Sequence, residues 1–101
     1  MTGTADEMRL KSELMQLITP AQITKIESRD WCSATFQGRQ LRYDILWQGR
    51  AGQAGVSRLA SLLPDHPFPL ERHFIADIIV ENISDLDAET TAEISILMIA
   101  D

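Results

Sequence analysis

The sequence contains only one cysteine, Cys32, and its longest apolar run covers five residues, 96–100. A single thiol excludes a disulfide within the chain and is typical of a reducing compartment such as the cytoplasm. A membrane-spanning helix needs roughly 18 or more apolar residues, so we expect no membrane span. Residues 1–15 alternate charged and apolar side chains, which is unlike a secretory signal. These features predict a cytoplasmic protein.

Positive charge is also scarce, because 9 basic residues face 15 acidic ones and the formal net charge is −6. Nucleic-acid binding depends on clustered Lys and Arg, so we expect no nucleic-acid partner. The charge is uneven: residues 1–58 carry eight basic and six acidic side chains, and residues 59–101 carry one and nine. The acidic second half makes an inhibitor or adaptor of a basic protein one alternative for the function.

The chain lacks internal repeats, low-complexity segments and linkers rich in Gly, Ser or Pro. Its apolar fraction of 45% and charged fraction of 24% are typical of a globular protein. A chain of 101 residues has room for one hydrophobic core. We therefore expect residues 1–101 to form a single domain.

Two amphipathic helices are predicted. Thr4 and Glu7 fit a capping box at the start of the first, which ends before Pro20. The second follows the glycine-rich stretch 49–55, where small residues allow close packing, and ends before Pro64. Their apolar stripes consist of Leu10, Leu14, Leu17 and Ile18 in the first helix and Val56, Leu59, Ala60 and Leu63 in the second.

Branched and aromatic side chains between residues 22 and 48 predict strands. The alternating runs 31–36 and 41–47 indicate a hairpin that turns near Gly38. We favour a strand for residues 22–28, with a short helix as the alternative. Cys32 falls on the apolar side of its run, and we expect it to act as a small buried hydrophobe.

The strongest strand patterns cover residues 72–83 and 91–101, joined by the polar connection 84–90. One face of this hairpin is predicted to join the core: Phe74, Ala76, Ile78, Val80, Ala92, Ile94, Ile96, Met98 and Ala100. The other face mixes Ile75, Ile79, Ile83, Leu97 and Ile99 with Asp77, Glu81, Glu93, Ser95 and Asp101. That face is too apolar for an ordinary solvated sheet, so we expect something to cover it.

The order of elements predicts an α+β fold with a predominantly antiparallel sheet and two main helices on one face. A ferredoxin-like arrangement is one candidate, because periodicity does not give the order of the strands. The competing possibility for the half-apolar hairpin face is a helix of the same chain packed against it.

Motifs for catalysis or cofactor binding are missing. The glycine-rich stretch 49–55 lacks the Lys-Ser/Thr pair of a phosphate loop. His73, Asp77 and Glu81 share a strand face, but roughly 13 Å separates successive members, which is too far for one metal ion. We therefore expect no catalytic residue, no cofactor and no metal.

The leading interpretation is a noncatalytic protein-interaction module that self-associates, as a homodimer, through its second hairpin. The candidate interface consists of Ile75, Asp77, Ile79, Glu81, Ile83, Leu97 and Ile99. The alternative is a small-molecule binding protein or small enzyme with a pocket near residues 64–73. Its candidate polar groups are Asp65, His66 and His73.

Overall fold

The computed structural model describes residues 5–101. Its elements are α1 (Ala5–Ile18), β1 (Gln22–Cys32), β2 (Gln37–Gln48), α2 (Gly52–Leu62), β3 (His73–Leu86) and β4 (Glu89–Ala100). Single 3₁₀ turns, Gly49–Ala51 and Leu63–Asp65, flank α2. The predicted α+β class with an antiparallel sheet is confirmed. Thr4 of the predicted capping box lies outside the described residues.

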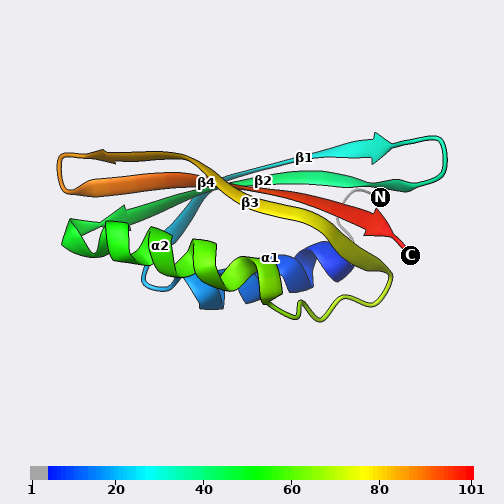
Figure 1. The fold of residues 1–101 in the computed structure, drawn as a ribbon, viewed down its shortest axis with the longest axis horizontal. Helices are drawn as coiled ribbons and strands as arrows, with labels where there is room; N and C mark the ends of the chain where they lie inside the picture. Colours follow the sequence, from blue (N-terminus) through cyan, green and yellow to red (C-terminus); the bar gives the residue numbers. More distant parts are fainter. Residues whose placement is uncertain (1–4) are drawn as a thin grey trace.

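The four strands form one antiparallel sheet in the order β1-β2-β4-β3, with both helices against the same face (Figure 1). We call this the inner face and the opposite one the outer face. No helix within residues 5–101 covers the outer face, so the competing possibility is wrong for this part of the chain. No helix there is long and apolar enough to cross a membrane.

The sheet contains one split βαβ unit of the ferredoxin-like kind: β2 and β3 are parallel, are joined through α2, and have β4 between them. The order of elements along the chain, with α1 first and β4 last, differs from the βαββαβ order of that arrangement. Here β1 and β2 form one hairpin, and β3 and β4 form another. The connection through α2 carries the chain past the sheet to its far edge, and β4 then returns between β3 and β2. Every neighbouring pair is therefore antiparallel.

The core lies between the helices and the inner face. Its buried members are Leu10, Leu14, Ile18, Leu41, Tyr43, Ile45, Trp47, Val56, Leu59, Leu63, Ala92, Ile94, Ile96 and Met98. Ile78 and Val80 are only partly buried, because β3 is an edge strand. Ala60 and Ala100, both predicted to be in the core, are exposed. Gly55 allows α2 to approach closely, since a Cβ there would meet the Trp47 indole.

The first hairpin turns earlier in the chain than predicted. Its turn consists of residues 33–36, and Gly38 lies inside β2. The Ser33 amide donates to the Phe36 carbonyl at 2.8 Å, and the Phe36 amide donates to Ser33 Oγ at 3.1 Å. These bonds close the turn without glycine. Gly38 instead serves close packing, because a Cβ there would meet the carbonyl oxygen of Met98.

The strand predicted for residues 22–28 is confirmed as part of β1. The expectation for Cys32 is wrong, because its side chain is exposed. Cys32 ends the edge strand β1, beyond the reach of the helical layer (Figure 1). No side chain within residues 5–101 buries it there.

A bulge in β3 reverses two predicted side-chain directions. Ile75 pairs with Met98 and Asp77 pairs with Leu97, so Ala76 is an extra residue in β3. The side chains of residues before the bulge therefore point to the opposite face of the sheet from the one that strict alternation predicts. Ile75 packs against the core, whereas Phe74 pairs with Ile99 and is 43% exposed. The assignment of Ile75 to the outer face is thus wrong, and that of Phe74 to the core is wrong as well.

The second hairpin has a shorter connection than the predicted residues 84–90. Its strands continue to Leu86 and from Glu89, which leaves Asp87 and Ala88 as the turn. Both have positive φ, 51° and 63°, the conformation of a two-residue turn that matches the twist of the strands.

Replacement of Ala88 by glycine is expected to stabilise the protein. An alanine at φ 63° carries steric strain that glycine does not have. We expect Ala88→Gly to raise the free energy of unfolding by about 0.5–1 kcal/mol, measured by urea denaturation. The exposed Ala60 in helix α2 is the matched control, because glycine at this position lowers stability by a similar amount. A loss of stability for Ala88→Gly contradicts the turn geometry.

Candidate functional site

The outer face carries an apolar area near the end of the sheet where β3 begins. Four large side chains belong to it: Phe74, Ile79, Leu97 and Ile99, and we call them the outer apolar patch. Phe74 and Ile79 are each 43% exposed, whereas Leu97 is half-buried and Ile99 is 7% exposed. Trp31, Gly38, Ile99 and Phe74 are paired in one row across all four strands. The patch therefore extends toward both edges of the sheet.

A network of charged side chains occupies the rest of the outer face. Arg42 lies at its centre, 2.8 Å from a Glu27 carboxylate oxygen and 3.3 Å from one of Glu93. The hydrogen bond to Glu27 is the main cause that raises the pKa of Arg42. Lys25 approaches Glu27 at 2.7 Å, and Ser95 donates a hydrogen bond to Glu81 at 3.0 Å. Arg42 Nε is buried without a hydrogen-bond partner, although it lies near Glu93, and the other groups pair with one another. The patch is thus the apolar part of this face.

The structure brings most of the candidate interface together. Ile79, Leu97, Ile99, Asp77 and Glu81 all have outer-face positions in the register of β3 and β4. Ile75 does not, for the reason given above. Ile83 is 55% exposed in a second irregularity between Glu81 and Ser84, outside the paired positions. Sequence periodicity missed Phe74, because nothing in the residue pattern marks the bulge at Ala76.

The candidate polar pocket corresponds to a cavity of about 570 Å³ beside the connection between α2 and β3. His66 and His73 both line it, whereas Asp65 does not. His66 Nε2 lies 3.3 Å from a carboxylate oxygen of Glu13, and its ring meets Phe68 edge to face at 4.7 Å. The sequence prediction thus placed two of the three polar groups at one cavity.

His73 is held by Asp6, a residue for which sequence analysis gave no functional or packing role. Asp6 is 3% exposed, and one of its carboxylate oxygens lies 2.7 Å from His73 Nδ1. The amides of Glu71 and Arg72 donate to the same carboxylate at 2.9 and 2.8 Å. We call this arrangement the Asp6 clamp, because it joins the first turn of α1 to the start of β3.

The electrostatics of the clamp favour an ionised carboxylate. Burial by itself raises the pKa of Asp6, but the hydrogen bonds from Glu71, His73 and Arg72 outweigh it and hold the pKa well below its usual range. The clamp uses both oxygens of Asp6, so this carboxylate is occupied by its own chain. No sequence motif signals such a contact, since its partners lie more than 60 residues away.

The side chains that line this cavity support few kinds of catalysis. Its lining includes His66, His73 and Asp77, but it has no Ser, Cys or Lys to act as a nucleophile beside His73. Within residues 5–101, no group of three His, Cys, Asp or Glu side chains is placed to hold a metal ion. Both imidazoles contact carboxylates of α1. Through these contacts the two histidines hold α1 against the residues that follow α2.

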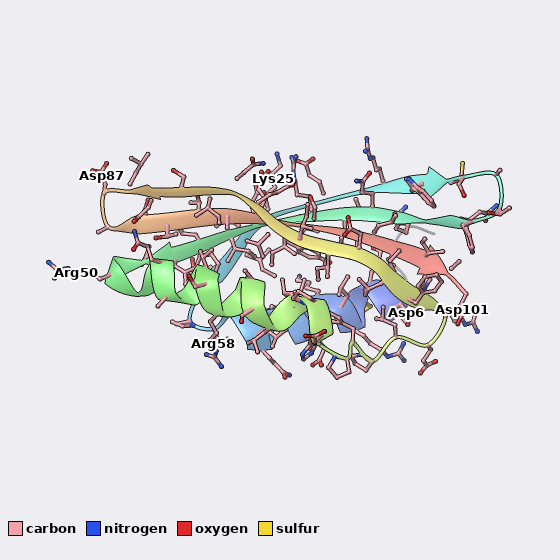
Figure 2. The ribbon with its side chains drawn as sticks, in the orientation of Figure 1. Asp6, Lys25, Arg50, Arg58, Asp87 and Asp101 are labelled. Carbon is pink, nitrogen blue, oxygen red and sulfur yellow. The ribbon has the colours of Figure 1, made fainter. Side chains whose placement is uncertain are left out.

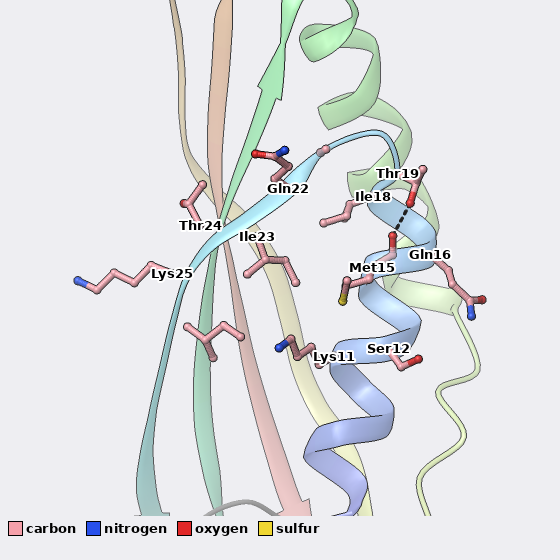
Figure 3. A pocket seen from close by; sticks show the side chains of 12 residues that line it. Lys11, Ser12, Met15, Gln16, Ile18, Thr19, Gln22, Ile23, Thr24 and Lys25 are labelled. Carbon is pink, nitrogen blue, oxygen red and sulfur yellow. Dashed lines mark hydrogen bonds between the residues drawn. The ribbon is translucent and has the colours of Figure 1, made fainter.

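A groove between α1 and the edge strand β1 is the largest hollow described, at about 890 Å³ (Figure 3). Met15 and Ile26 are 51% and 43% exposed at its sides, and Ile23 points from β1 toward the helix. Lys11 also lies in the groove. Sequence analysis did not predict this site, because the residues of α1 and β1 meet only through the packing of the two elements.

Comparison with known proteins gives no assignment: no family model matches the chain, and no curated protein or solved structure is significantly similar to it. The function must therefore be argued from the surfaces of the chain itself.

Proposed function

We propose that this chain is a noncatalytic, cytoplasmic protein-interaction module that self-associates as a homodimer through the outer apolar patch. The observation that supports this is the one-sided arrangement of the sheet. Both helices pack on the inner face (Figure 1), while the register of β3 and β4 places Phe74, Ile79, Leu97 and Ile99 on the other. Phe74 and Ile79 supply most of the exposed apolar surface of the patch, and soluble monomers seldom leave large contiguous apolar areas bare.

A second copy of the chain is the simplest cover for this patch. A two-fold axis makes one surface complementary to itself, so no second partner is needed. The charged network around Arg42 borders the patch, and most of its groups are paired with one another. It can therefore form the hydrated rim that surrounds the apolar centre of a typical interface.

The alternative function is binding or conversion of a small molecule at the cavity lined by His66 and His73. The observation that favours it is the pairing of each histidine with a carboxylate beside a hollow of about 570 Å³. The interaction module is favoured, because these pairs already have a packing role: they tie α1 to the connection and to β3.

A role as an adaptor of a basic protein has weaker support. The acidic residues Asp85, Asp87 and Glu89 lie around the turn between β3 and β4, at one end of the molecule (Figure 2). Asp85 already bonds Gln53 and Thr90. The remaining carboxylates are exposed, as expected for a solvated turn.

The double substitution Ile79→Asp with Leu97→Asp is expected to convert the dimer to a monomer. Two carboxylates buried in an apolar interface lose their hydration, so the dissociation constant should rise on the order of 100-fold or more. Sedimentation equilibrium at tens of micromolar measures this. The matched control is Leu62→Asp with Leu86→Asp, since both leucines are exposed outside the patch. A monomeric wild type, or a folded double variant that still dimerises, contradicts the proposal.

A further inference from the structure

We propose that the groove between α1 and β1 binds an extended acidic segment of a partner protein, which adds to the sheet as a strand beside β1. This surface is separate from the outer apolar patch, so the inference goes beyond the proposed self-association. Three observations carry it: the state of the two sheet edges, the apolar lining of the groove, and the charge within it.

The two edges of the sheet differ in their readiness to accept a strand. The register of β3 is broken at Ala76 and again at Asn82 and Ile83, and such bulges protect an edge from further pairing. The register of β1 has one irregularity, at Thr24, and then runs without interruption from Lys25 to Cys32. Its outer side is unpaired within residues 5–101. β1 is therefore the edge that offers backbone donors and acceptors to an incoming strand.

The groove beside β1 offers a seat for side chains of that strand. Alternate residues of a strand point to opposite faces, so every second side chain of an added strand would point toward α1. There it would meet the partly exposed Met15 and Ile26, in a groove of about 890 Å³. Aliphatic side chains suit this position, because Met15 adapts its shape to the group it contacts.

The charge within the groove selects an acidic occupant. The groove residues include Lys11 and Lys25 and no Asp or Glu, although the chain as a whole has a net charge of −6. Lys25 points away from α1 (Figure 3) and pairs with Glu27. Lys11 points from α1 toward β1, and no ion pair or hydrogen bond engages its ammonium group within the described part of the chain. A carboxylate is its natural partner.

The spacing of Lys11 and Met15 defines the sequence that fits. They are four residues apart on α1, which is roughly 6 Å along the helix axis. Side chains on one face of a strand repeat every two residues, at roughly 6.7 Å. One residue against Met15 and the next on the same side against Lys11 therefore form the pattern aliphatic, any residue, acidic in a strand parallel to β1, and the reverse order in an antiparallel one, since β1 runs opposite to α1 (Figure 1).

A second copy of the chain fits this groove less well than an acidic partner. The β1 strand it would contribute is charge-balanced, with Lys25 and Arg29 against Glu27 and Asp30. Such a strand brings no net attraction to Lys11. The acidic partner segment also requires no two-fold symmetry, so it can bind whether the protein is monomeric or dimeric.

Binding of a short synthetic peptide tests the proposal. The probe is a nonapeptide blocked at both ends, with Asp-Thr-Val-Thr-Asp at its centre and threonine elsewhere, so that it presents the pattern in both strand directions. Its control carries Lys in place of each Asp. Anisotropy of the labelled peptides measures affinity, and amide chemical shifts of the full chain locate the site. We expect the acidic peptide to bind and to shift amides of β1 and of α1 near Lys11.

The variant Lys11→Glu is expected to lower the affinity for the acidic peptide about tenfold, because a charge attraction becomes a repulsion. It should raise the affinity for the basic peptide, because there a repulsion becomes an attraction. Arg50→Glu makes the same change of net charge at the end of the molecule near Asp87 (Figure 2), and it should leave both affinities unchanged. Lys11 is exposed, so its replacement should not unfold α1.

Three outcomes would overturn the proposal. The first is no binding of the acidic peptide at millimolar concentration, and the second is equal weakening by Lys11→Glu and Arg50→Glu. The third is that amides of α1 near Lys11 shift with the concentration of the protein itself but not with the peptide, which would assign this groove to a second copy. None of these results depends on the outer apolar patch, so the test is independent of the proposed dimer.

Discussion

Substitution of Asp6 by asparagine is expected to lower the free energy of unfolding at neutral pH by about 3 kcal/mol. Asparagine has nearly the same shape, so the change removes charge and an acceptor without opening a cavity. Its amide nitrogen replaces one of the two carboxylate oxygens, so it faces the backbone N–H of either Glu71 or Arg72, each of which needs an acceptor. Two buried N–H donors then face each other, and one of them has no acceptor. The contact between α1 and the start of β3 is weakened as a result.

Urea denaturation at pH 7 measures this loss, with Asp30→Asn as the matched control. Asp30 pairs with Arg39, but its side chain is 91% exposed, and exposed ion pairs contribute at most about 1 kcal/mol. Equal destabilisation by the two substitutions would contradict the central role of the Asp6 clamp.

The same pair of proteins should differ in their response to acid. The pKa of Asp6 lies well below its ordinary value of 3.8 in the folded state, so the folded protein holds the ionised form more strongly than the unfolded chain. This contribution is complete above the ordinary value and is lost as the pH falls toward the lowered one. The stability difference between wild type and Asp6→Asn should therefore be constant near neutrality and shrink below about pH 4.

Truncation of Ile96 is expected to have the largest effect within the core. Ile96 is 1% exposed on β4, which has strands on both sides, so Ile96→Ala leaves a cavity that the sheet closes poorly. The expected loss is about 4 kcal/mol. Ile78 pairs with Ile96 from the edge strand β3 and is partly buried, so Ile78→Ala should cost about 2 kcal/mol.

Denaturant midpoints of these variants, compared with Arg42→Ala, test the assignment of the two faces. Arg42 lies on the outer face with its side chain 42% exposed, and its loss should change stability by less than about 1 kcal/mol. Midpoints that move equally for Ile96→Ala and Arg42→Ala would show that the inner and outer faces are assigned wrongly.

The sequence by itself determined the local elements and most of the core. The stripe of Leu10, Leu14 and Ile18 in α1, and the alternation that buries Ile94 and Ile96 in β4, are both local repeats. Helical and strand periods follow directly from backbone geometry, so a window of residues is enough to recognise them. For the same reason the α+β class and the antiparallel pairing of each hairpin were predictable.

Only the tertiary structure decided the features on which the function depends. A bulge at Ala76 places Phe74 on the outer face and Ile75 on the inner face, the opposite of the prediction, because one extra residue reverses the direction of the side chains that precede it. The Asp6 clamp and the groove beside Lys11 join segments far apart in the chain, and no local pattern records which segments will meet. The strand order, which leaves β1 as the uninterrupted edge, depends on the path of the chain through α2. Such contacts are set by the packing of whole elements around one core, so only the folded chain displays them.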